Sequence, residues 1–127
     1  MDGRFRLCLV LGALLVAAGI ALEAWHAHGL RNRLDSESWA AVGRAIHQQE
    51  LAGLGLIALA LAGCGGILSW AAAAGFLLAA LLFSGAVYLK HLAGMEGATV
   101  TAPLGGVLHI LSWLLVACAP WLGGKAP

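Results

Sequence analysis

Residues 51–89 read LAGLGLIALALAGCGGILSWAAAAGFLLAALLFSGAVYL, and this almost continuously apolar stretch decides the fold. As a single α-helix it would be about 60 Å long at 1.5 Å per residue, roughly twice the hydrocarbon thickness of a bilayer. The chain must therefore reverse direction inside it. Gly63, Gly65 and Gly66 predict the position of the reversal, because glycine clusters favour turns. Two membrane spans follow, at about 51–67 and 70–89.

Two more apolar segments, at about 7–25 and 104–122, are each long enough to cross a bilayer. The arginines before the first segment resemble the start of a secretory signal. However, Glu23 and Trp25 stand where a cleavage site would need small residues. We therefore expect the first segment to be retained as a membrane helix, which gives four spans.

The composition agrees with a membrane protein. Hydrophobic residues make up 61% and charged residues 10% of the 127-residue chain, against about 25% charged residues in soluble domains. In lipid every backbone N–H and C=O must find a partner within the protein, which excludes open sheets. Four spans with short connections predict an all-α, integral membrane four-helix up-down bundle that forms a single domain over 1–127. The net charge of +1 provides no basic patch for nucleic acid.

The polar stretch between the first two spans contains one more helical pattern. Trp39, Val42 and Ile46 recur at the spacing of one helix face. This pattern predicts a short interfacial helix over about 37–49 that lies on the membrane surface and runs into the second span.

An even number of spans puts both termini on one side of the membrane. Positively charged residues, which favour the cytoplasmic side, are nearly balanced between the two sides. Cys8, Cys64 and Cys118 all fall toward the side of the termini, which suits a reducing compartment. We therefore expect a multi-pass protein of the cell inner (plasma) membrane with cytoplasmic termini.

Ionisable residues cluster where the first span leaves the membrane and the second returns. Glu23 and His26 are three residues apart, as are His47 and Glu50, and residues three apart share one face of a helix. Glu-x-x-His pairs on facing helices are the ligand pattern of carboxylate-bridged di-iron bundles. Imidazole and carboxylate together suit zinc, copper or iron. The candidate site for a divalent metal or haem comprises Glu23, His26, His28, His47, Glu50 and His109.

A second interpretation needs no cofactor, and the sequence favours it. Glu23, His26 and His47 lie within about a turn of the membrane surface, where long polar side chains can reach the headgroups. Two carboxylates close together in a low dielectric need a proton or a cation between them. Glu23 and Glu50 are thus expected either to bind a metal or to join a Glu–His hydrogen-bonded network, and both alternatives stay open.

Small residues recur on several spans and let helices approach closely. The serines and histidines form no nucleophile–base set, and the cysteines lack the close spacing of a redox or zinc motif, so we expect no enzymatic activity. The sequence predicts a small non-catalytic accessory or stabilising subunit of a larger membrane complex, in contact with lipid and with other subunits or copies of itself. The alternative is a metal- or haem-binding membrane protein. The glycines predicted to pack helices are Gly12, Gly19, Gly53, Gly85, Gly105 and Gly106.

Three segments carry a resemblance to a known family. They are 27–30 (AHGL), 82–89 (LFSGAVYL) and 101–106 (TAPLGG), followed by Trp113. The segments occur in this order over nearly the whole chain. The chain thereby resembles the small four-helix membrane proteins of domain-of-unknown-function family 423. The resemblance implies a four-span membrane protein with no established activity. Where that family has small or apolar residues, this chain has Glu23, His26 and His109, so it carries additional ionisable side chains.

Overall fold

The computed structural model describes residues 2–63 and 65–122, and its four membrane-length segments are helical. No strand occurs in this described part of the chain. The predicted all-α four-helix membrane bundle is therefore confirmed. The elements are α1 (Gly3–Trp25), the π-helical turn η1 (His26–Leu30), α2 (Ser36–Ala62), α3 (Ile67–Ala79), the π-helical segment η2 (Ala80–Gly85), α4 (Ala86–Ala93), the 3₁₀-helix η3 (Glu96–Thr101) and α5 (Ala102–Leu122).

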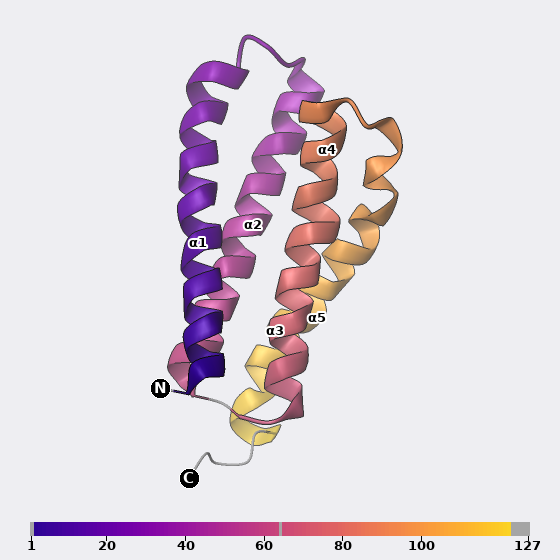
Figure 1. Ribbon diagram of the computed structural model, residues 1–127. Helices are drawn as coiled ribbons and strands as arrows, with labels where there is room; N and C mark the ends of the chain where they lie inside the picture. Colours follow the sequence, from indigo (N-terminus) through magenta and orange to yellow (C-terminus); the bar gives the residue numbers. More distant parts are fainter. Residues whose placement is uncertain (1, 64, 123–127) are drawn as a thin grey trace.

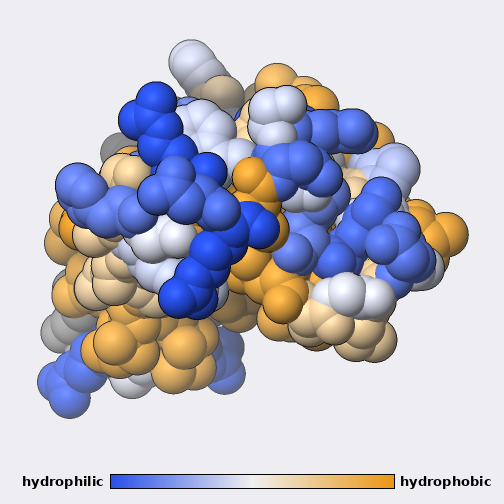
Figure 2. All heavy atoms as spheres, turned by 90° about the horizontal axis from the view of Figure 1, so that it is seen from above, coloured by the Kyte–Doolittle hydropathy of each residue, from blue (hydrophilic) through white to orange (hydrophobic). Residues whose placement is uncertain are grey.

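The segments run alternately up and down, so the start of α1 and the end of α5 lie at the same end of the molecule (Figure 1). α1 packs mainly along α2, and α5 packs mainly along α3 and η2. The inner segments bury 50% and 44% of their most apolar windows, against 17% in each outer segment. Figure 2 shows hydrophilic residues gathered over the end opposite the N-terminus. α1 and α5 are therefore the outer, more exposed helices of the bundle.

The predicted reversal between the second and third spans is confirmed. α2 ends at Ala62 and α3 begins at Ile67. Gly63 has φ +63° and Gly66 has φ +108°, conformations that glycine adopts far more readily than other residues. Gly63 ends α2 by entering the left-handed region, so the second span stops before its predicted limit. Cys64, which the sequence assigns to the side of the termini, lies outside the described residues.

The interfacial helix predicted over 37–49 is helical, but it is not a separate element. α2 runs through these residues without a break. Val42, Ile46 and Gln49 on this part of α2 are buried inside the bundle. Their spacing therefore marks a stripe that faces neighbouring helices, and the prediction of a separate helix on the membrane surface was wrong.

A short turn joins η1 to α2. The backbone N–H groups of Arg33 and Leu34 donate to the Leu30 carbonyl at 3.0 and 3.1 Å. Asp35 then caps α2 by accepting a hydrogen bond of 2.7 Å from the Ser38 backbone N–H. This bond stabilises the carboxylate and holds the pKa of Asp35 below its usual value. The polar connection is consequently only five residues long, between Leu30 and Ser36.

Two apolar clusters fill the interior. The larger one includes Phe76, which is fully buried and meets the rings of His109 and Trp113 edge-on at centroid distances of 5.8 and 5.1 Å. The smaller one lies toward the hydrophilic end of the bundle. Its fully packed members are Leu30, Val42 and Ile46.

Glycines set the distance between α1 and α2. A β-carbon added to Gly12 would lie 2.5 Å from the Gly53 carbonyl oxygen, and one added to Gly53 would lie 2.7 Å from the Gly12 carbonyl oxygen. Both distances are shorter than real β-carbon contacts. The two helices therefore cross with their backbones in contact, which only glycine permits on both sides.

Candidate functional site

A pair of carboxyl groups lies between α1 and α2. The side chain of Glu50 in α2 lies against the side chain of Glu23 in α1. Glu23 reaches Glu50 because helical side chains lean toward the N-terminus of their helix, and Gly19 leaves the room that the Glu50 side chain occupies. The Oε1 atom of Glu50 is buried and has no hydrogen-bond partner. Two carboxyl groups in contact repel each other unless a proton or a cation lies between them.

A set of hydrogen-bonded polar side chains lies close to this pair and connects three segments. The Tyr88 hydroxyl donates to Gln49 Oε1 at 2.8 Å, and Gln49 Nε2 donates to the Leu15 carbonyl at 2.9 Å. Ser84 Oγ donates to the Ala45 carbonyl at 2.7 Å. These bonds link α1, α2 and the α3–α4 segment through groups that lipid could not satisfy. The sequence analysis missed Gln49, although it follows Val42 and Ile46 on the same helical stripe.

His26 is held by Trp39 rather than by Glu23. Its ring stacks on the Trp39 ring at a centroid distance of 4.3 Å and an interplanar angle of 14°. The His26 Nε2–H donates to the Trp39 carbonyl at 2.7 Å, and Trp39 Nε1 donates back to the His26 carbonyl at 3.0 Å. These two reciprocal hydrogen bonds hold η1 against the start of α2, so His26 stabilises the connection between the first two segments.

The remaining candidate histidines are dispersed. His28 and His47 are exposed, whereas His109 is 5% exposed and its Nε2 atom has no hydrogen-bond partner. Of the six candidate ligands the structure brings together Glu23 and Glu50. Within residues 2–63 and 65–122, no group of three His, Cys, Asp or Glu side chains is placed to hold a metal ion.

The six candidate packing glycines also divide into two groups. Added β-carbons at Gly12, Gly19, Gly53 and Gly105 would collide with a neighbouring helix; at Gly105 the Phe83 backbone nitrogen would lie 2.7 Å away. At Gly85 the nearest atom would be 3.8 Å away, and at Gly106 nothing lies within 4 Å. Gly55 and Gly75 are close-packing positions that the sequence analysis did not include among the six, against Phe76 and Ser112.

The chain is similar to proteins of one family. A family model described as "Protein of unknown function (DUF423)" matches residues 22–106. The UPF0382 membrane protein of Staphylococcus haemolyticus is 32% identical over 115 residues, which cover 87% of this chain and 92% of that protein. The UPF0382 membrane protein YwdK of Bacillus subtilis is 30% identical over 119 residues, covering 87% and 93%. No solved structure matches the chain.

Proposed function

The chain belongs to the DUF423 family and is a multi-pass membrane protein, and from this premise we propose that it acts without catalysis, as an accessory subunit that packs against other membrane helices. Its partners are other subunits of a membrane complex or further copies of itself. The main support for the proposal is the composition of the exposed face of α1.

This face combines small side chains with exposure. Ala13, Ala17, Ala21 and Ala24 are exposed and follow one another at four- and three-residue spacing. Small residues four apart let a second helix approach closely in lipid, where close packing rather than hydrophobicity drives association. α1 packs mainly along α2, which leaves the alanine face available for a partner helix.

The glycines and the alanines of α1 lie on different faces of this helix. The close-packing glycines of α1 lie at its contact with α2, whereas the alanines lie on the exposed side. The support for assembly therefore comes from alanines, and not from the glycines on which the sequence prediction relied.

We expect Ala17→Ile to disrupt the assembly, because two added branches would push a partner helix away. Ala117→Ile is the matched control, since Ala117 is an exposed alanine on α5, the outer helix at the other edge. The measurement is site-specific photocrosslinking from positions 17 and 117 in native membranes, with migration of the solubilised variants on blue-native gels. Position 17 should crosslink to a membrane protein and Ala17→Ile should migrate faster. A wild-type monomer without crosslinks from position 17 would refute the accessory role.

We also propose that the protein lies in the inner (plasma) membrane with the end that carries the start of α1 in the cytoplasm. Cys8 and Cys118 lie toward that end of their helices, as suits a reducing compartment. In a variant without native cysteines, Asn32→Cys should react with an impermeant maleimide in intact cells. Asp2→Cys, at the opposite end, should react only after permeabilisation. The reverse pattern would invert the orientation.

A further inference from the structure

A groove of about 410 Å³ runs between α1 and α3 at the end of the molecule that holds the N-terminus. It is left open because α1 packs mainly along α2. Leu7 and Leu11 line one side, and Ala74 and Leu77 line the other. From the first lining residue to the last, each wall extends over about 10 Å of helix.

The groove is apolar along its length and positively charged at its mouth. The Arg4 guanidinium lies 5.7 Å from the centroid of the Trp70 ring, and both residues line the groove. Tryptophan favours the level of the lipid headgroups, so this end lies at the membrane surface. Among the residues that the structure describes, no carboxylate forms an ion pair with Arg4. Its positive charge is thus available to an anion from outside the protein.

We propose that this groove binds one acyl chain of an anionic phospholipid, with the headgroup phosphate against Arg4. Basic residues at the membrane surface attract anionic lipid, and the apolar walls match a hydrocarbon chain. A partner helix fits less well. A helix with side chains is at least 10 Å wide, so 10 Å of its length occupies roughly 800 Å³, twice the volume of the groove.

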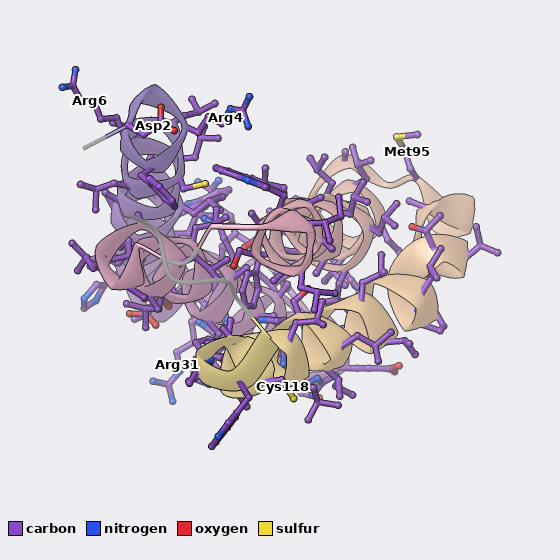
Figure 3. The ribbon with its side chains drawn as sticks, turned by 90° about the horizontal axis from the view of Figure 1, so that it is seen from below. Asp2, Arg4, Arg6, Arg31, Met95 and Cys118 are labelled. Atoms are coloured by element: carbon purple, nitrogen blue, oxygen red, sulfur yellow. The ribbon has the colours of Figure 1, made fainter. Side chains whose placement is uncertain are left out.

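The chain supplies matched controls for both parts of the site. Figure 3 shows Arg4 and Arg6 pointing to different sides of α1, and only Arg4 lines the groove. Ala71 and Ala74 are both exposed residues of α3, but only Ala74 lines the groove. Arg6→Ala and Ala71→Leu therefore repeat the chemical change of Arg4→Ala and Ala74→Leu outside the site.

The test is native mass spectrometry of the full chain, released from nanodiscs that contain equal amounts of phosphatidylglycerol and phosphatidylcholine with identical acyl chains. The wild type should retain phosphatidylglycerol about fivefold better, as one surface arginine is expected to provide. Arg4→Ala should abolish this preference, and Ala74→Leu should lower the retention of both lipids. Arg6→Ala and Ala71→Leu should behave as the wild type.

Three results would overturn the proposal. Equal loss in Arg4→Ala and Arg6→Ala would mean general attraction to a basic helix end. Unchanged retention in Ala74→Leu would mean that the acyl chain lies elsewhere. A protein crosslinked to Ala74→Cys in native membranes would mean that a partner, and not lipid, fills the groove.

Discussion

Gly53→Ala is expected to lower the free energy of unfolding by about 1–3 kcal/mol, as overpacking of a tight contact does. The added methyl would lie 2.7 Å from the Gly12 carbonyl oxygen, 2.9 Å from Val16 Cγ2 and 3.0 Å from Leu15 Cβ. A backbone carbonyl cannot rotate away as a flexible side chain can, so α1 must move off α2. The measurement is reversible unfolding in lipid–detergent mixtures, followed by circular dichroism.

Gly106→Ala is the control for this prediction. Gly106 is also a helical glycine, but an added β-carbon there meets no atom within 4 Å. Alanine favours a helix over glycine by about 1 kcal/mol, so this variant should be as stable as the wild type or more stable. Equal stability of Gly53→Ala and the wild type would contradict the backbone contact between α1 and α2.

Glu50→Gln is expected to raise the stability of the bundle at neutral pH by on the order of 1 kcal/mol. In the wild type, the side chain of Glu50 lies against the carboxyl group of Glu23, and two ionised carboxyl groups in contact repel each other. The Oε1 atom of Glu50 is also buried without a hydrogen-bond partner. A glutamine is uncharged and can donate a hydrogen bond to Glu23, so it removes the repulsion and keeps the contact.

The check is an unfolding curve at neutral pH for the wild type, Glu50→Gln and Glu96→Gln. Glu96 is exposed at the start of η3, so Glu96→Gln should be as stable as the wild type. A Glu50→Gln variant that is no more stable than the wild type would contradict repulsion between the two carboxyl groups.

The spans could be predicted because lipid imposes length and polarity on a helix. The reversal at Gly63 followed from the same reasoning, since 39 apolar residues cannot cross a bilayer once. The continuity of α2 could not be predicted. The spacing of Val42 and Ile46 specifies one apolar face, but it does not say whether that face meets headgroups or another helix.

The candidate site was predictable only in part. Glu23 and Glu50 meet, as expected from two helices that leave and re-enter at one membrane face. His26 does not join them, because its ring stacks on Trp39 and its Nε2–H donates to the Trp39 carbonyl. His47 lies beside the buried Ile46 but on the exposed side of α2. Whether a side chain lies on the buried or the exposed side of its helix depends on tertiary packing, which the spacing of residues in the sequence does not determine.

The contacts of α1 with α2 and of the α3–α4 segment with α5 have a consequence for biosynthesis. Each of these pairs joins neighbours in sequence, so the molecule consists of two helical hairpins linked at Gly63. Closing a short loop costs little chain entropy, and domains emerging from the ribosome form from the N-terminal part first. The first hairpin can therefore assemble while the second is still being translated. The second hairpin then docks on a finished surface of α2, and the order of synthesis becomes the order of assembly.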